Sequence, residues 1–278
     1  STPTEISYDV NVNLAANSFN HAWADFNQDG KIDIVTTHAG GLFVFENRSP
    51  RPEPLVTGTY ASIASGITIT KPAGDGGLVA GDFDGDGLPE FASTNPTTDN
   101  MRVWRNTGSY RIEATQFAVV GDLPTGDNPG RLYIGDLDSD GKMDLLLYHG
   151  TGTSTTLLIV FHNQSTPGNI VFNRVDFTLP AAATVAHIRD LDGDGRPEII
   201  VTSEGTDQFF ILKNLSTPGT LDASSFAAAF ATPVTNPRGL TTGDLNADGK
   251  PEIIITSAPN SLLIFENNVA IGPVITIT

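Results

Sequence analysis

Short apolar runs alternate with polar stretches along this chain, and the same order of runs returns five times. In each repeat, one apolar run follows an acidic stretch and a second follows a polar turn. The first runs are residues 32–35, 91–92, 145–147, 199–201 and 253–255, and the second are 42–45, 101–104, 157–161, 209–212 and 262–265. They are rich in branched residues and bounded by Gly, Pro, Asn and Thr, which predicts β-strands. A helix would need about ten periodic residues between turns, and none occurs.

Two further strands complete each repeat. A short run such as 21–24 or 132–135 leads into the acidic stretch. An outer strand is expected between repeats, at 62–70, 114–120, 170–179 and 225–234. Each second run is closed two positions later by an asparagine, here called the closing asparagine: Asn47, Asn106, Asn163, Asn214 and Asn267. Three of these begin Asn-x-Ser sequons, at Asn47, Asn163 and Asn214, and turn chemistry explains them better than glycosylation.

The acidic stretch is a nine-residue phrase, and its five copies are called acidic loops 1 to 5. They span residues 25–33, 82–90, 136–144, 190–198 and 244–252, with intervals of 57, 54, 54 and 54 residues between first aspartates. A repeat period of this length is typical of solenoids, propellers and arrays. We therefore predict an all-β fold, a β-propeller of four-stranded antiparallel blades, with five blades.

The predicted propeller is a single domain over residues 1–268. The segment 5–14 resembles an outer strand without a preceding blade, so it is expected to complete the last blade and close the ring, which removes open sheet edges. Residues 269–278 are then a tail, a strand or a linker to a following domain. Alternatively, 274–278 supplies the last outer strand and the N-terminal segment is a linker.

Each acidic loop has the ligand pattern of a calcium site. Acids or asparagines at positions 1, 3 and 5, glycine at 6, a backbone carbonyl at 7 and an acid at 9 present hard oxygens to one point. The predicted ligands are Asp25, Asn27, Asp29, Lys31, Asp33, Asp82, Asp84, Asp86, Leu88, Glu90, Asp136, Asp138, Asp140, Lys142, Asp144, Asp190, Asp192, Asp194, Arg196, Glu198, Asp244, Asn246, Asp248, Lys250 and Glu252. An EF-hand would place its acid at position 12 between helices. Position 12 here is Thr36, Ser93, Leu147, Val201 and Ile255, which excludes that motif.

Composition fits this interpretation. The 278 residues carry a formal net charge of −17, and 18 of the 32 acids lie in the acidic loops. About five structural Ca²⁺ ions would bring the charge to about −7, and Mg²⁺ suits so many protein oxygens less well. The acidity argues against nucleic acid as a partner. The absence of cysteine excludes disulfides and a thiol nucleophile. No apolar run is long enough to span a membrane, and any export signal is expected to be removed or to lie outside this sequence.

The acidic loop, the apolar strand after it and the closing asparagine resemble the FG-GAP/VCBS repeat, over residues 5 to 268. That repeat builds the β-propeller of integrin α-subunits and of many secreted bacterial proteins. The resemblance implies that each loop joins the first and second strands of a blade, opposite the usual ligand face. Family propellers usually have seven blades, so a five-bladed ring and part of a larger ring both remain open.

Chemistry beyond the metal is sparse. The five histidines are scattered, and no Gly-x-Ser-x-Gly elbow is present. His38 and His149 fall in equivalent turns on the expected ligand face, and a solvated turn histidine is the favoured interpretation. Trp23 and Trp104 occupy positions that other copies fill with core residues. The ligand-face turns are 37–41, 95–100, 149–154, 204–208 and 258–261, which are polar and unlike one another.

The predicted function is therefore a non-catalytic calcium-binding module of a secreted or cell-surface protein. It would mediate adhesion or binding to an extracellular protein or glycan, as part of a larger multidomain protein. The alternative is a polysaccharide-active enzyme, a lyase or glycosidase, because relatives of the family include enzymes on propeller scaffolds.

Overall fold

The structure is a computed structural model that describes residues 18–38, 41–48, 60–63, 76–108, 111–149 and 155–268. These residues are almost entirely β. Their helical content is limited to two 3₁₀ turns of three residues each, η1 (Ala114–Gln116) and η2 (Glu204–Thr206). The predicted all-β class is confirmed. The described chain has no helix with the length and apolar character of a membrane span.

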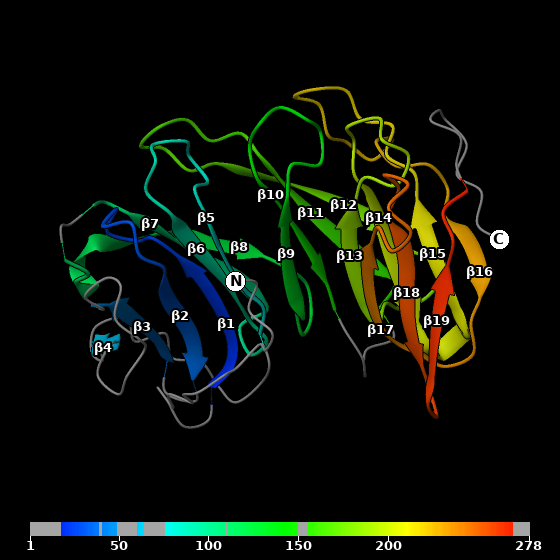
Figure 1. Ribbon diagram of the computed structural model, residues 1–278. Coiled ribbons are helices and arrows are strands. Elements are labelled where there is room, and N and C mark those ends of the chain that lie inside the picture. Colours follow the sequence, from blue (N-terminus) through cyan, green and yellow to red (C-terminus); the bar gives the residue numbers. More distant parts are fainter. Residues whose placement is uncertain are drawn as a thin grey trace.

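The strands form five antiparallel sheets in chain order (Figure 1). Sheet 1 holds β1 (Ser18–Ala24), β2 (Asp33–His38), β3 (Gly41–Asn47) and β4 (Tyr60–Ile63), and sheet 2 holds β5 (Leu78–Gly81), β6 (Glu90–Asn95), β7 (Asn100–Asn106) and β8 (Phe117–Pro124). Sheet 3 holds β9 (Arg131–Gly135), β10 (Asp144–Tyr148), β11 (Leu157–Asn163) and β12 (Phe172–Thr178). Sheet 4 holds β13 (Val185–Arg189), β14 (Glu198–Ser203), β15 (Gln208–Leu212) and β16 (Phe230–Pro233), and sheet 5 holds β17 (Pro237–Gly243), β18 (Glu252–Ser257) and β19 (Ser261–Phe265).

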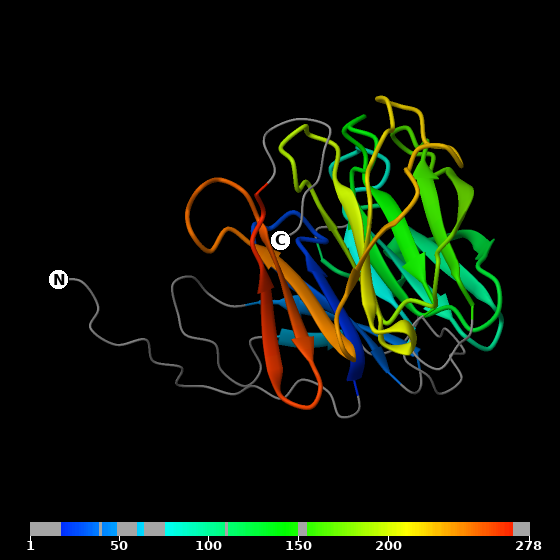
Figure 2. The same ribbon diagram turned by 90° about the vertical axis from the view of Figure 1, so that its right-hand side faces the viewer.

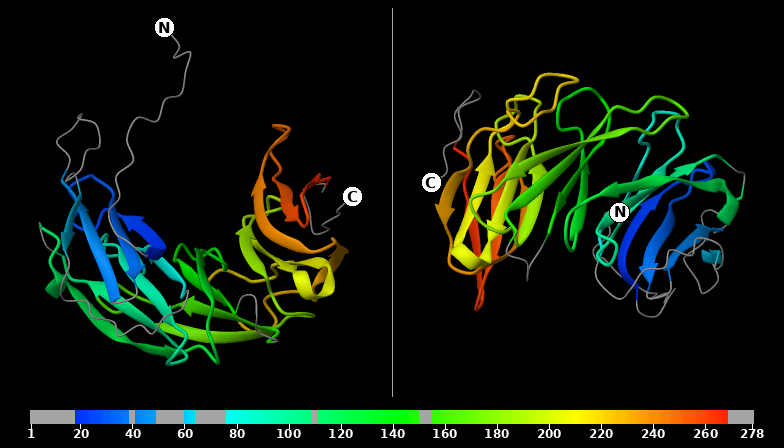
Figure 3. Two further views of the ribbon diagram at one scale, coloured as in Figure 1. Left: turned by 90° about the horizontal axis from the view of Figure 1, so that it is seen from below. Right: turned by 180° about the vertical axis from the view of Figure 1, so that it is seen from behind.

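The sheets stand side by side around an open arc, with sheet 1 at one end and sheet 5 at the other (Figure 3). Their first strands line the inside of the arc, since β1 packs against β5, β5 against β9, β9 against β13 and β13 against β17. Each sheet is a meander of neighbouring antiparallel strands. This is a propeller-like arrangement.

The outer strands differ most from the sequence prediction. Three of them occupy Phe117–Pro124, Phe172–Thr178 and Phe230–Pro233, so their bounds are shifted or shortened. Of the strand predicted at 62–70, residues 62 and 63 belong to β4 (Tyr60–Ile63), and the rest lies outside the described residues. Sheet 5 has three strands among the described residues, drawn in orange to red in Figure 2. The segments 5–14 and 269–278 lie outside the described residues, so ring closure and the domain bounds stay predictions.

The cores lie between successive sheets. On β10, Leu145 and Leu147 pack into the core shared with sheet 2, while Leu146 and Tyr148 pack into the core shared with sheet 4. All four side chains are buried, because alternate residues of a strand point to opposite faces and both faces are covered. This explains why the middle strands read as continuous apolar runs.

The two ends of the arc expose apolar side chains that equivalent positions elsewhere bury. Leu262 and Ile264 on β19 are 63% and 55% exposed, and Leu245 at position 2 of acidic loop 5 is 55% exposed. The residues at position 2 of the other loops are at most 1% exposed: Phe26, Phe83, Leu137 and Leu191.

At the other end of the arc, the prediction that Trp23 is a core residue is wrong. Its side chain is 61% exposed on the face of sheet 1 that points away from sheet 2. Trp104 is buried as predicted.

In sheets 2 to 5, the closing asparagine ties the sheet to the acidic loop of the preceding sheet. In sheet 3, Asn163 Nδ2 donates to Met143 O at 3.0 Å in its own loop and to Phe83 O at 2.8 Å in loop 2. The same pair of bonds recurs at Asn106, Asn214 and Asn267, each reaching position 8 of its own loop and position 2 of the loop before. The closing asparagines are buried, so turn chemistry explains the three sequons, as predicted.

Replacing Asn163 with alanine is expected to destabilise the protein strongly. The change removes two donor bonds and the bond that Asn163 Oδ1 accepts from Ser165 N at 2.9 Å, all in a buried setting. We expect a loss of about 3 kcal/mol in the free energy of unfolding, measured by denaturant titration. The exposed Asn173→Ala is the control and should change it by less than about 0.5 kcal/mol. Equal effects of the two changes would contradict the role of the closing asparagine.

Candidate metal centres

The acidic loops connect the first and second strands of each sheet, and all five share one hydrogen-bond pattern. The position 1 carboxylate accepts the glycine N–H of position 6 at 2.7–2.9 Å. The position 3 side-chain oxygen accepts the N–H of position 5, and the position 5 carboxylate accepts the N–H of position 7. Each ligand candidate is therefore held in place by the backbone that follows it.

Backbone geometry explains the glycine at position 6. Its φ is between 78° and 89° in all five loops, a left-handed conformation that favours glycine. Position 4 is also left-handed, with φ of 56° at Gln28, 58° at Ser139 and 61° at Ala247. These two residues turn the chain so that the side chains at positions 1, 3 and 5 converge.

The acid at position 9 joins the loop to the third strand. Asp144 Oδ2 accepts the N–H of Leu137 at 2.9 Å, and Asp144 Oδ1 accepts the N–H of Asn163 at 2.8 Å. Asp33, Glu90 and Glu198 make both bonds, and Glu252 makes the first with Leu245 N at 2.7 Å. All five are at most 2% exposed. The position 9 acid is thus a buried structural link as well as a ligand candidate.

Burial makes these carboxyls hard to ionise. It raises the pKa of Asp33 to about 6, of Asp144 to about 7 and of Glu90 to about 8, and nearby loop acids add to the shift. The pKa of Glu198 is raised for the same reason. The backbone bonds oppose the shift without cancelling it.

The structure brings many of the predicted ligands together. Asp82, Asp84 and Asp86 each offer an oxygen, and these oxygens lie within 4.8 Å of one another. The same is true of Asp136 with Asp138 and Asp144, and of Asp190 with Asp192 and Asp194. Three of the side chains at position 7 pair with the carboxylate at position 5: Lys31 with Asp29, Lys142 with Asp140 and Arg196 with Asp194. The role of the position 7 backbone carbonyl as a metal ligand stays a prediction.

One set of residues at the loops was missed by sequence reasoning. The residue before the closing asparagine points into the acidic loop of its own sheet. In sheet 2, Arg105 bonds Asp84 and Asp86 at 3.0 and 2.9 Å. In sheet 4, Lys213 pairs with Asp192, Asp194 and Glu198. These two loops carry a built-in cation.

The same position has other chemistry in the remaining sheets. In sheet 1 it is Glu46, whose Oε1 lies 3.4 Å from Asn27 Nδ2, and in sheet 5 it is Glu266. In sheet 3 it is His162, whose Nε2 lies 2.9 Å from Asp138 Oδ2. A loop with asparagine at position 3 thus has glutamate before the closing asparagine of its sheet. A loop with aspartate at position 3 has Arg, Lys or His there. This pairing was visible in the sequence, but it joins residues about 20 positions apart.

Neighbouring loops also contact one another. Gln28 Nε2 donates to Gly87 O at 2.8 Å, and Ser139 Oγ donates to Gly195 O at 2.7 Å. A hollow of about 470 Å³ lies between loops 4 and 5, with Asp190, Asp192 and Asp248 in its lining. Loops 1 and 2 and loops 3 and 4 are therefore joined by direct hydrogen bonds, and loops 4 and 5 border one hollow.

The FG-GAP-like repeat family matches residues 25–93, 82–147 and 190–255, which together are more than half of the chain. The chain belongs to the FG-GAP-like repeat family. The resemblance inferred from the acidic loops is thereby confirmed. Comparison with curated proteins gave no match.

A solved structure has a similar fold. It is described as the structural basis of specific recognition of non-reducing terminal N-acetylglucosamine by an Agrocybe aegerita lectin. The match has a TM-score of 0.56 at 14% sequence identity, and covers 89% of this chain and 63% of the lectin chain. At this identity the likeness shows the fold alone.

Stability of the metal-free protein should fall as pH rises. Asp33, Asp144 and Glu90 have folded pKa values of about 6, 7 and 8 against ordinary values of 3.8 and 4.5. Their contribution is therefore complete below about pH 4 and is lost as pH rises through 6 to 8. We expect the melting temperature of metal-free protein, measured by calorimetry, to decrease from pH 5 to pH 9. A melting temperature that rises over this range would contradict the assignment of these carboxyls.

Proposed function

We propose that this chain is a non-catalytic, calcium-stabilised binding module of the propeller type. The acidic loops are its scaffold, and its ligand surface is formed by the turns at the opposite ends of the strands. The observation that carries the proposal is the geometry of loops 2, 3 and 4, in each of which three side-chain oxygens lie within 4.8 Å of one another, beside a buried position 9 acid. A ring of five blades and about five Ca²⁺ ions are part of the proposal.

The donor sets fit calcium. Oxygen ligands from positions 1, 3, 5 and 9 and a carbonyl from position 7 match its preference for six to eight oxygens. Two buried carboxylate oxygens, Asp138 Oδ2 and Glu252 Oε1, have no hydrogen-bond partner among the described residues, and both belong to acidic loops. A bound cation would compensate them and the other crowded carboxylates. Loops 2 and 4 already hold Arg105 and Lys213, so we expect them to bind calcium more weakly than loops 1 and 5.

Two turns of the opposite face, in sheets 2 and 4, are fixed by hydrogen bonds. In sheets 2 and 4, Asp99 and Asp207 occupy left-handed turn positions. Asp99 Oδ1 accepts Asn128 N at 2.8 Å and Asp207 Oδ1 accepts Asn236 N at 2.6 Å, which fixes the strand-connecting segments beside the turns. A pre-arranged surface of this kind lowers the entropic cost of binding.

His149 belongs to this fixed framework. The favoured interpretation of His149 as a solvated turn residue is wrong, because its ring is buried between Thr125 O at 3.2 Å and Leu157 O at 3.3 Å. It therefore holds the turn in place instead of meeting a ligand.

A glycan is the favoured ligand class. The structural likeness to a lectin supports this choice, and the turns of the opposite face offer amides, carboxylates and hydroxyls that suit sugar hydroxyls. We place the module in a secreted or cell-surface protein, where millimolar calcium would fill sites of moderate affinity.

Calcium should raise the melting temperature. A single loop filled at 100 times its dissociation constant contributes about 2.7 kcal/mol, or roughly 5–10 °C in a domain of this size. Calorimetry of metal-free protein with and without Ca²⁺ measures this shift. Asp244→Asn, which removes one charge from loop 5, should reduce it, while the exposed Asp127→Asn should leave it intact. An unchanged melting curve with Ca²⁺ would contradict the stabilising role.

Glycan binding can be tested on an array that includes glycans ending in non-reducing N-acetylglucosamine. We expect calcium-dependent retention without release of reducing ends. Calcium-dependent binding that weakens in Asp244→Asn and survives Asp176→Asn, a change at an exposed position of the outer strand β12, would link the ligand surface to the loops through stability. Release of reducing ends would instead favour the polysaccharide-active enzyme, and absence of any binding would contradict the choice of a glycan.

A further inference from the structure

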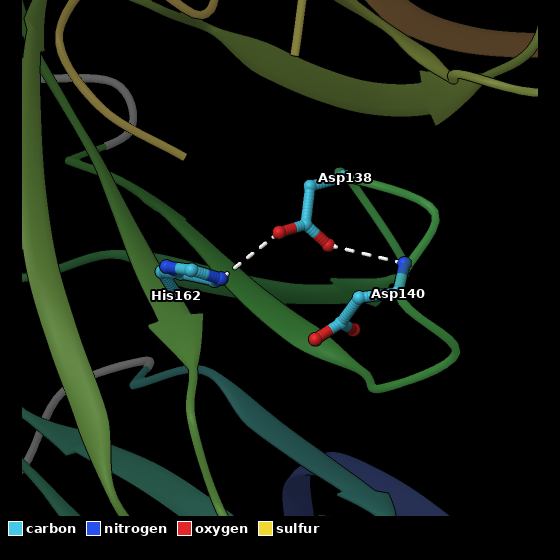
Figure 4. A group of neighbouring side chains, drawn as sticks. All are labelled: Asp138, Asp140 and His162. Carbon is cyan, nitrogen blue, oxygen red and sulfur yellow. Dashed lines mark hydrogen bonds and ion pairs between the residues drawn. The ribbon is translucent and has the colours of Figure 1, made fainter. Parts of the chain in front are cut away.

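Acidic loop 3 differs from the other four loops in one respect. His162, on β11, directs its ring toward Asp138 and Asp140 (Figure 4). His162 Nε2, Asp138 and Asp140 each offer a ligand atom, and the three atoms lie within 4.8 Å of one another. The side chains of His162 and Asp138 are 5% and 0% exposed. A nitrogen ligand is therefore buried against two carboxylates.

The contact between His162 and Asp138 is favourable only when a proton or a metal ion joins the two atoms. Nε2 and Oδ2 face each other at 2.9 Å, and neither makes a hydrogen bond within the described part of the chain. Asp138 Oδ1, by contrast, accepts the N–H of Asp140 at 3.3 Å. Two lone-pair atoms at this distance repel each other unless a proton or a metal ion lies between them.

In loops 2 and 4, a charged side chain pairs with the equivalent carboxylates. Asp84 Oδ2, the counterpart of Asp138 Oδ2, accepts bonds from Arg105 Nε and from Gly168 N, both at 3.0 Å. Lys213 pairs with three carboxylates of loop 4. Arginine and lysine cannot ligate a metal in their charged forms, whereas neutral imidazole can.

We propose that loop 3 is a selective site for a divalent transition metal of the Zn²⁺ type, held by His162 Nε2 and carboxylate oxygens of Asp138 and Asp140. Zn²⁺ takes four ligands, so one imidazole nitrogen and two carboxylate oxygens leave its fourth position for water. All-oxygen loops suit Ca²⁺ instead. This inference rests on the proposed function, because loop 3 would otherwise hold Ca²⁺, and it makes one of the five sites chemically distinct.

The test is a calorimetric titration of the calcium-saturated protein with Zn²⁺. Wild type should bind one Zn²⁺ in loop 3 and release one Ca²⁺, counted by elemental analysis. His162→Arg is the matched variant, because it copies Arg105 of sheet 2, keeps a cation beside Asp138 and removes the nitrogen ligand. We expect it to weaken zinc binding at least about 100-fold, beyond the loss seen when an outer-shell partner is removed.

The control is His21→Gln, which changes an exposed histidine on β1 and should leave zinc binding unchanged. In wild type, the ¹⁵N resonance of His162 Nε2 should shift on addition of Zn²⁺. Equal zinc binding by wild type and His162→Arg, or no zinc site in wild type, would overturn the proposal and leave an imidazolium ion pair in its place. Calcium binding by the other loops, measured in the same samples, tests the proposed function separately.

Discussion

The buried acid at position 9 of each acidic loop is the interaction on which the rest of the structure depends. Its two oxygens join the start of the loop to the end of the third strand, so one carboxylate fixes the loop on its own sheet. Burial makes the charge costly, as the raised pKa values of Asp33, Glu90 and Asp144 show. The fold therefore places this link where a negative charge is least stable, and the proposed cation would relieve that cost.

The next level of order follows from this link. Once the loop is fixed, its position 2 carbonyl faces the following sheet and accepts the closing asparagine of that sheet. Its position 2 side chain enters the core between the two sheets. Stability at a loop is thus transmitted to the packing of its neighbour. At the end of the arc Leu245 has the same position but is exposed, because no sheet follows it within the described residues.

The sequence predicted the repeated parts of the molecule well. The middle strands, the acidic loops and the glycine at position 6 follow from local patterns that are repeated five times. The outer strands were placed less accurately, since they lie at a sheet edge where β16 is mostly exposed and its pattern is weak. Trp23 was assigned to a core because its counterparts are core residues, and only the arrangement of the sheets shows that its neighbour is missing from the described chain.

The chemistry of individual loops was harder to predict than their existence. Arg105, His162 and Lys213 follow apolar strands and look like ordinary strand ends in sequence. Their partners Asp84, Asp138 and Asp192 lie about 20 residues earlier, and only strand pairing shows that they meet. The burial of His149 was equally hard to predict, because its ring contacts the carbonyl oxygen of Thr125, more than 20 residues earlier. Local patterns predict a repeat, while differences between its copies depend on contacts across the sheet.

The central claim is that a cation at the acidic loops stabilises the link made by the position 9 acid. Hydrogen exchange of the backbone amides that bond this acid tests it most directly, at position 2 of each loop and at Asn47, Asn106, Asn163 and Asn214. We expect Ca²⁺ to slow exchange at these amides more than at amides in the middle of β10 or β14. Equal protection of these amides in the metal-free and the calcium-saturated protein would contradict it.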